Sequence, residues 1–226
     1  MARRPKKLTR KDIRRPDQFI TFTGTLFDFF SRNRTQFLIA SSLLILTVSA
    51  LWFWEFYNVR QNRLASRDYF RAINLYHEGK PREALALLKA VTAYRNSSHG
   101  PLATIQLANA HIALKEPTQA GTILREFLAA EHNEPLVRQS ALLALGYAEE
   151  LSGNCNGAID HFTAAEKTPG PLKEEALLAA ARCSIQAGDP KQALALYKRY
   201  LTDFPGSDRV SEIVLRVQML EGQVTQ

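Results

Sequence analysis

The sequence predicts an all-α protein, in which a single N-terminal transmembrane helix precedes a helical repeat solenoid of about four helix pairs and a C-terminal capping helix. Three observations carry this prediction. The stretch from Thr35 to Trp54 contains no charged residue. The chain after this stretch is rich in Ala and Leu with helical periodicity, and a turn recurs in it about every 36 residues.

The uncharged stretch is long enough to cross a bilayer. A helix rises 1.5 Å per residue, so about 20 residues cover the roughly 30 Å of the hydrocarbon core. We expect a transmembrane anchor over 35–57, with Trp52, Trp54 and Tyr57 forming an aromatic belt at the outer interface. The lead before Thr35 is too long for a cleaved signal peptide, so the anchor should be retained. The competing interpretation is a buried core helix.

Charge predicts the orientation of this anchor. The tail 1–34 holds ten Lys and Arg against three Asp and Glu, whereas the rest of the chain holds nineteen of each. Positively charged flanks stay in the cytoplasm, which places the tail inside and residues 55–226 outside the cytoplasm. The basic excess is confined to this tail beside anionic lipid, so a nucleic-acid partner is not expected.

The tail itself has two parts. Residues 1–16 are too polar to bury a core. From Asp17, a plausible N-cap, the pattern predicts an amphipathic helix over 17–31 with its Phe-rich face on one side. This helix would lie in the inner interface of the membrane or dock on a membrane partner, and the sequence leaves both open.

The repeat is defined by four turns and by pairs of small residues. The turns are Glu78-Gly79-Lys80-Pro81, Lys115-Glu116-Pro117, Ser152-Gly153-Asn154 and Ala187-Gly188-Asp189-Pro190. A small residue follows each turn, and another stands twelve positions before it, giving the pairs Ala72/Ala84, Ala108/Ala120, Gly146/Ala158 and Ala181/Ala193. Small residues on two antiparallel helices let the helices approach closely, so each unit should be a helix-turn-helix.

This pattern resembles the tetratricopeptide repeat. The shared features are the small residues, their spacing, and the large apolar or aromatic residue four positions later, at Leu88, Leu124, Phe162 and Tyr197. The early Trp of that repeat is absent from all four units. We expect a repeat domain over 62–222, with units at 62–98, 101–133, 135–168 and 171–205 and a cap at 207–222.

No motif of catalysis or ligand binding stands out. The five histidines have no metal-ligand spacing, and no P-loop, G-x-G-x-x-G or G-x-S-x-G is present. We therefore expect no enzyme activity, no metal, no cofactor and no small-molecule substrate.

The two cysteines lie on helices that should be antiparallel. Cys155 opens the second helix of unit three, and Cys183 lies late in the first helix of unit four, at similar sequence distance from the loop between them. In an oxidising compartment this arrangement favours a disulfide between Cys155 and Cys183, and the alternative is a pair of buried thiols.

Repeat solenoids bind through the face formed by the first helix of each unit. In the tetratricopeptide register this face is apolar and aromatic and would suit an apolar segment of another protein, with Asn109 and Arg182 as polar contacts. The predicted partner-binding groove is formed by Tyr69, Ile73, Tyr76, Ile105, Asn109, Ile112, Leu143, Tyr147, Glu150, Leu178 and Arg182. Alternatively, several of these side chains pack between the repeats.

The basic tail, the single span and the exported divergent repeat domain together resemble the ancillary SecYEG translocon subunit (YfgM-like) family. That resemblance implies a single-pass protein of the bacterial inner membrane with a periplasmic domain, which assists secretion or folding of exported proteins. Its partners would be proteins: translocon subunits, periplasmic chaperones or exported clients. The alternatives are an anchored tetratricopeptide factor of c-type cytochrome maturation and a structural scaffold of an envelope complex.

Overall fold

The computed structural model describes residues 32–94, 97–130 and 134–224, and all regular structure in these ranges is helical. The chain divides into two compact units, Met1–Tyr57 and Asn58–Gln226. The amphipathic helix predicted over 17–31 lies outside the described residues.

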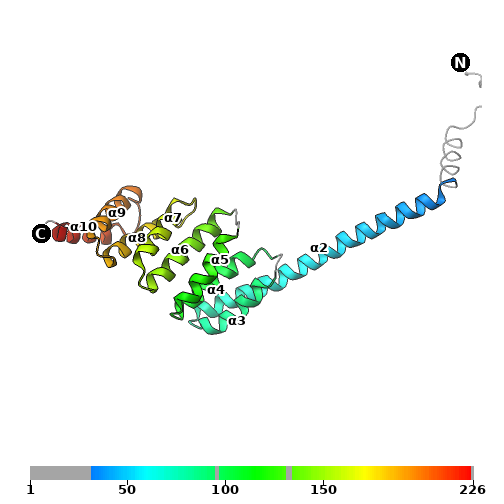
Figure 1. Cartoon of the computed structure of the whole chain (residues 1–226), viewed down its shortest axis with the longest axis horizontal. Coiled ribbons are helices and arrows are strands. Elements are labelled where there is room, and N and C mark those ends of the chain that lie inside the picture. Colours follow the sequence, from blue (N-terminus) through cyan, green and yellow to red (C-terminus); the bar gives the residue numbers. More distant parts are fainter. Residues whose placement is uncertain (1–31, 95–96, 131–133, 225–226) are drawn as a thin grey trace, which may run out of the picture. The chain divides into compact units, whose positions relative to one another are not determined.

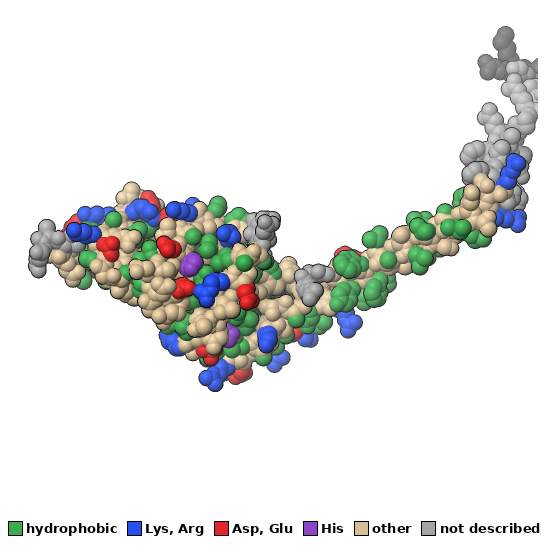
Figure 2. Space-filling model, viewed as in Figure 1, with side chains coloured by type: hydrophobic (Ala, Val, Ile, Leu, Met, Phe, Trp, Pro, Cys, Tyr) green, Lys and Arg blue, Asp and Glu red, His purple; other side chains and the backbone are tan. Residues whose placement is uncertain are grey.

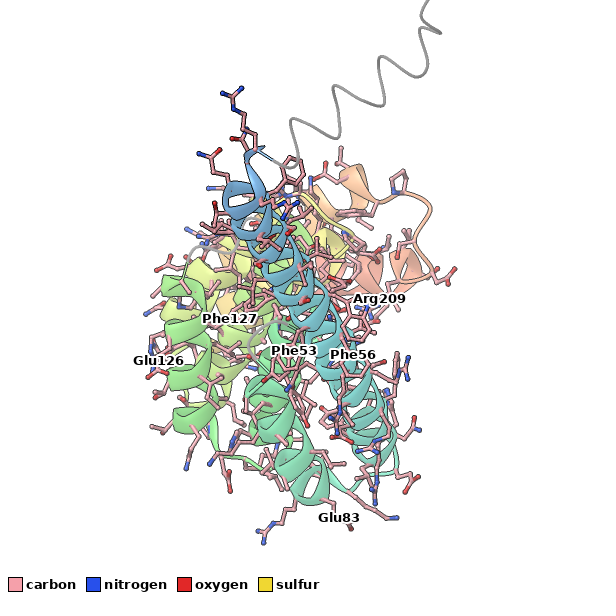
Figure 3. All side chains as sticks on the ribbon, turned by 90° about the vertical axis from the view of Figure 1, so that its right-hand side faces the viewer. Phe53, Phe56, Glu83, Glu126, Phe127 and Arg209 are labelled. Carbon is pink, nitrogen blue, oxygen red and sulfur yellow. The ribbon has the colours of Figure 1, made fainter. Side chains whose placement is uncertain are left out.

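The first unit contains the beginning of α2 (Arg34–His77), a helix of 44 residues. It is the one helix in the described ranges that is long and apolar enough to cross a membrane, and none of its most apolar window is buried. Trp52 is 70% exposed, and apolar side chains cover this part of the helix in the space-filling view (Figure 2). Phe53 and Phe56 project from the helix (Figure 3). The helix continues into the second unit without a break, although the sequence analysis separated the anchor from the first repeat helix.

The second unit is a succession of helix pairs in which each helix lies beside the next (Figure 1). The end of α2 packs with α3 in one core cluster, and three further pairs and the cap follow. These helices are α3 (Pro81–Thr92), α4 (Gly100–Ala113), α5 (Pro117–Ala129), α6 (Pro135–Leu151), α7 (Cys155–Lys167), α8 (Lys173–Gln186), α9 (Pro190–Asp203) and α10 (Val210–Val224). The predicted fold class, an all-α solenoid of four helix pairs with a terminal helix, is confirmed.

The four predicted turns share one backbone geometry. One residue in each has a left-handed conformation, with φ of 76° at Gly79, 62° at Lys115, 81° at Gly153 and 80° at Gly188. In the third turn Gly153 N donates to Glu150 O and Asn154 N to Glu149 O, at 3.0 and 2.9 Å. The other three turns repeat this pattern, which is the Schellman ending of an α-helix.

The predicted small residues form the contacts between paired helices. All seven alanines in the four pairs have no exposed surface, and Gly146 is buried. A Cβ atom on Gly146 would lie 2.4 Å from the ring of Phe162, which is itself fully buried. The close approach of α6 and α7 therefore requires glycine at this position.

In the third and fourth units, a polar side chain near the start of the first helix holds the loop that follows the second helix through hydrogen bonds. The buried Gln139 of α6 donates to Ala165 O and Thr168 O, at 3.1 and 3.2 Å, and accepts from Leu172 N at 3.1 Å. Near the start of α8, Glu174 plays the matching part, because it accepts from Tyr200 at 2.5 Å and from Ser207 at 2.6 Å. These contacts fix the loops that follow α7 and α9.

Candidate protein-binding face

The first-helix face consists of outward side chains of α4, α6, α8, α10 and the last turns of α2. Of the eleven residues predicted for it, Ile105, Leu143 and Leu178 are buried, with 5, 8 and 8% exposure. They pack in the core clusters between helices, which agrees for these three with the alternative interpretation of side chains packed between the repeats. The reason is angular, because one position along a helix turns a side chain by about 100°.

The other eight predicted residues keep accessible surface. Arg182 is exposed, and seven are half-buried, namely Tyr69, Ile73, Tyr76, Asn109, Ile112, Tyr147 and Glu150. The prediction of a groove on these residues stays a prediction, because accessibility permits binding without demonstrating it.

The N-terminal part of the face is aromatic and weakly polar. The Tyr69 ring lies 5.4 Å from the ring of His99 and 5.6 Å from that of Phe70. Burial raises the pKa of Tyr69. Asn109 Nδ2 donates to Gln106 Oε1 on the same helix at 3.4 Å.

The C-terminal part of the face is charged, which differs from the apolar surface expected there. Arg182 of α8 binds Glu150 of α6 with two parallel bonds, Nε to Oε1 and Nη2 to Oε2, both of 2.7 Å. Its guanidinium also lies 5.8 Å from the centre of the Tyr147 ring. The Tyr147 hydroxyl donates to Glu175 of α8. Helices α6 and α8 are thus joined by two charge-assisted contacts that surround one aromatic ring.

These contacts keep their ionisation states near neutral pH. Burial, followed by the hydrogen bond to Glu175, raises the pKa of Tyr147. The hydrogen bond to Glu150 raises the pKa of Arg182 further. The tyrosine therefore stays a donor and the arginine a cation, so these two groups do not titrate in the physiological range.

Charged residues that sequence reasoning missed extend this surface onto α10. Arg209 lies 3.6 Å from Glu175, and Arg216 donates from Nε and Nη2 to Glu212 Oε1 at 2.9 and 2.7 Å. The i,i+4 spacing of Glu212 and Arg216 could have indicated their pairing. No sequence signal connects Arg209 with α8. A pocket of about 120 Å³ is lined here by Leu178, Arg182, Tyr197, Arg209, Glu212, Ile213 and Arg216.

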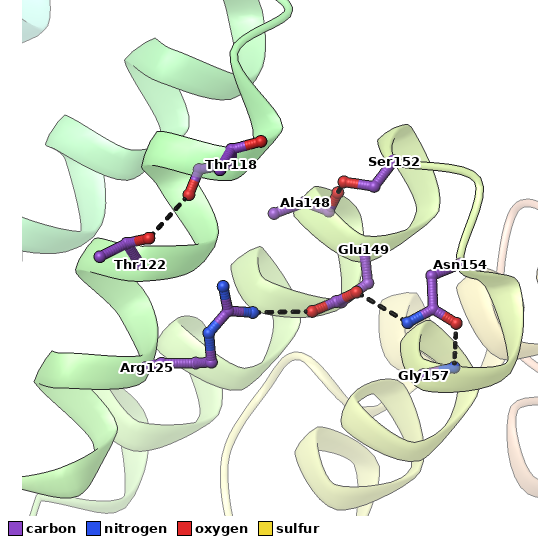
Figure 4. Close-up of polar contacts among 8 residues, drawn as sticks. All are labelled: Thr118, Thr122, Arg125, Ala148, Glu149, Ser152, Asn154 and Gly157. Carbon is purple, nitrogen blue, oxygen red and sulfur yellow. Dashed lines mark hydrogen bonds and ion pairs between the residues drawn. The ribbon is translucent and has the colours of Figure 1, made fainter.

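A separate polar contact joins α5, α6 and α7 (Figure 4). Arg125 donates to Glu149 Oε1 at 2.9 Å, and Asn154 donates to Glu149 Oε2 at 2.9 Å. Asn154 also caps α7 by accepting from Gly157 N at 3.1 Å. This chain of contacts is structural, since it fixes the third turn against the preceding pair.

Cys155 and Cys183 lie in one core cluster between α7 and α8. Both are free thiols, with 8 and 0% exposure, and Cys155 Sγ lies 3.1 Å from Gln186 Oε1. Burial raises the pKa of the Cys183 thiol to about 12. The arrangement brings the two cysteines together, and the disulfide stays a prediction.

Family models agree with the repeat pattern. Two models of the tetratricopeptide repeat match, one over residues 75–145 and the other over residues 143–208. Together they span 75–208, so the chain is a tetratricopeptide-repeat protein. This fold typically serves as a non-catalytic scaffold for protein partners, and the repeat domain is accordingly a protein–protein interaction module. No curated protein matches the sequence.

Solved structures with the same fold belong to several different proteins. The TPR-like repeats of a putative kinesin light chain from Podosopora anserina superpose with a TM-score of 0.57 at 18% identity, covering 73% of this chain and 94% of that one. Pseudomonas aeruginosa PilF gives 0.60 at 16%, covering 73 and 71%. A double mutant of MamA from RS-1 gives 0.53 at 16%, covering 71 and 96%. At such identities the likeness supports the fold alone.

Proposed function

We propose that this protein is a membrane-anchored interaction module of the bacterial inner membrane, which assists secretion or folding of exported proteins near the Sec translocon. Its N-terminus would be cytoplasmic and its repeat domain periplasmic. The observation that carries the proposal is the joining of a fully exposed apolar helix segment to a tetratricopeptide-repeat domain within one chain. The apolar side chains need lipid around them, and the repeats suit protein partners.

The charge distribution supports the proposed orientation. The ten Lys and Arg of the tail 1–34 precede the apolar segment, and the chain after it is balanced. Protease added to spheroplasts should therefore degrade residues 58–226 and spare the tail. Protection of the repeat domain would overturn the proposed orientation.

The partner is tested by photo-crosslinking in intact cells. A benzophenone amino acid at Tyr147 places the reactive group on the first-helix face between α6 and α8. The matched control is the same probe at Glu126, an exposed residue that points outwards from α5 (Figure 3). Adducts to translocon subunits, periplasmic chaperones or exported chains from Tyr147, and not from Glu126, would support the proposal.

Adducts to other proteins would favour one of the alternative functions. Cytochrome-maturation proteins would favour a factor that holds apocytochrome, and one stable envelope complex would favour a scaffold. If neither position gives an adduct, the first-helix face is not the binding surface.

A further inference from the structure

We propose that the pocket between α8 and α10 receives the carboxylate side chain of an acidic residue in a partner segment. The inference deepens the proposed function, because it names the chemistry that one end of the first-helix face recognises. It rests on the convergence of three arginines on one small cavity, which Leu178 and Ile213 also line, and the repeat pattern requires none of these arginines.

The three arginines come from different positions in the fold. Arg182 lies on α8, Arg216 lies on α10, and Arg209 immediately precedes α10. All three line the same pocket, where Glu212 is the single acidic residue among the lining side chains. The lining therefore places three guanidinium groups around one cavity, and their planar sets of donors match the geometry of a carboxylate.

Each guanidinium lies against an acidic side chain. Arg182 and Arg216 use Nε and Nη2 in their contacts with Glu150 and Glu212. Tyr147 also interacts with the guanidinium of Arg182, and Tyr197, which lines the pocket, with that of Arg216. Arg209 approaches Glu175 through Nη1 at 3.6 Å, which is beyond ordinary hydrogen-bond length. The existing pairs thus orient the arginines, and the looser Arg209 can swing onto a guest.

The acidic residues behind the pocket set the strength of binding. Glu150 and Glu175 face the same arginines from outside the pocket lining, and with Glu212 they balance the three positive charges. A guest carboxylate gains from directed hydrogen bonds more than from net charge. We therefore expect weak binding that depends on geometry and declines with salt.

Size and lining decide the kind of guest. The cavity of about 120 Å³ accepts one carboxylate side chain and is well below the roughly 300 Å³ of a typical small-molecule site. Leu178 and Ile213 provide apolar walls beside the arginines. An Asp or Glu side chain fits this combination, with its methylene groups against Leu178 and Ile213 inside the cavity.

The test uses the purified full chain in detergent micelles and three acetylated tripeptides. The probe is acetyl-Leu-Glu-Leu-amide, the neutral control is acetyl-Leu-Gln-Leu-amide, and the third peptide is acetyl-Leu-Gln-Leu with a free terminal carboxylate. Binding is followed through the Nε–Hε signals of the arginines by NMR. We expect the probe to shift the signals of Arg209 and Arg216, and the neutral peptide to bind about tenfold more weakly.

Variants separate the pocket from general charge attraction. The double variant Arg209→Gln/Arg216→Gln should bind the probe about tenfold more weakly. Arg125→Gln should not weaken it, because that arginine is similarly exposed and also ion-paired but contacts Glu149 away from the pocket. A circular dichroism spectrum unchanged in both variants excludes unfolding.

Several outcomes would overturn the assignment. Equal binding of the probe and the neutral peptide, equal loss in the Arg125 control, or no binding would each reject it. Binding of the free-carboxylate peptide alone would move recognition to a chain terminus and reject the side-chain assignment. These results are independent of crosslinking at Tyr147, so failure of the pocket and failure of the proposed secretion role can be told apart.

Discussion

The second and third helix pairs have the same helix-turn-helix arrangement and differ in the side chains at the contact between their helices. Between α4 and α5 the close contact joins Ala108 to a helix that carries Leu124, whereas between α6 and α7 it joins Gly146 to one that carries Phe162. The larger ring in the third pair is matched by the loss of a methyl group. A larger residue on one helix is thus accommodated by a smaller residue on the helix that faces it.

The largest expected effect concerns the inter-unit loop. The buried Gln139 side chain makes three hydrogen bonds, one to the end of α7 and two to the loop after it, and Pro101 stands at the equivalent place in the second pair. Gln139→Ala should lower the free energy of unfolding by about 3 kcal/mol, because buried backbone groups lose their partners. Urea denaturation of the full chain in detergent, followed by circular dichroism, measures this change. A cost below about 1 kcal/mol would show that water replaces the amide.

The match in size between Gly146 and Phe162 can be broken directly. Gly146→Ala should destabilise the chain by about 2 kcal/mol, since the new Cβ would meet the Phe162 ring at 2.4 Å. Adding Phe162→Leu recreates the Ala and Leu combination of the second pair and should recover most of the lost stability. If the two changes simply add in the same denaturation experiment, the residues do not compensate each other.

The four turns differ in backbone strain, which should have a smaller effect on the free energy of unfolding. Lys115 adopts a φ of 62° where the third turn has Gly153 at 81°. Lys115→Gly should stabilise the chain by about 1 kcal/mol, and Gly153→Ala should destabilise it by a similar amount, because a Cβ atom is strained in this conformation. The urea midpoints of the two variants should move in opposite directions, and a shift in the same direction would contradict the argument.

The smallest effect depends on pH and compares the third and fourth pairs. Where the third pair has the neutral Gln139, the fourth has Glu174, and the hydrogen bonds from Ser207 and Tyr200 lower its pKa. Its contribution to stability is present above the unfolded pKa of 4.5 and is lost as the pH falls below it. The stability difference between the wild type and Glu174→Gln should shrink on acidification. A difference that is constant with pH would mean that the pKa of Glu174 is not lowered by folding.

The repeat architecture could be predicted from the sequence because its determinants are local. The turns, the small residues and the residues four positions later recur at readable spacings, and they formed the predicted pairs. The first-helix face was less predictable. Ile105, Leu143 and Leu178 turned inward, since a small rotation of a helix decides burial.

The charged end of that face depends on contacts between positions that are distant along the chain. Glu150 of α6 meets Arg182 of α8, and Glu175 meets both Tyr147 and Arg209, each of which lies on a different element. Periodicity fixes which residues face outwards, but it does not reveal which outward residues find one another. The unbroken course of α2 was similarly hidden, because the aromatic belt that ends at Tyr57 marks the end of the predicted anchor and carries no information on where the helix ends.

The four Schellman turns bear on how far such a chain can drift in evolution. Each is closed by main-chain hydrogen bonds, so its shape survives when the residues are exchanged, as Lys115 shows. A unit then has few positions under strict steric demand, and most of its surface is free to diverge. That tolerance is consistent with an architecture shared at 15–18% identity to its structural neighbours.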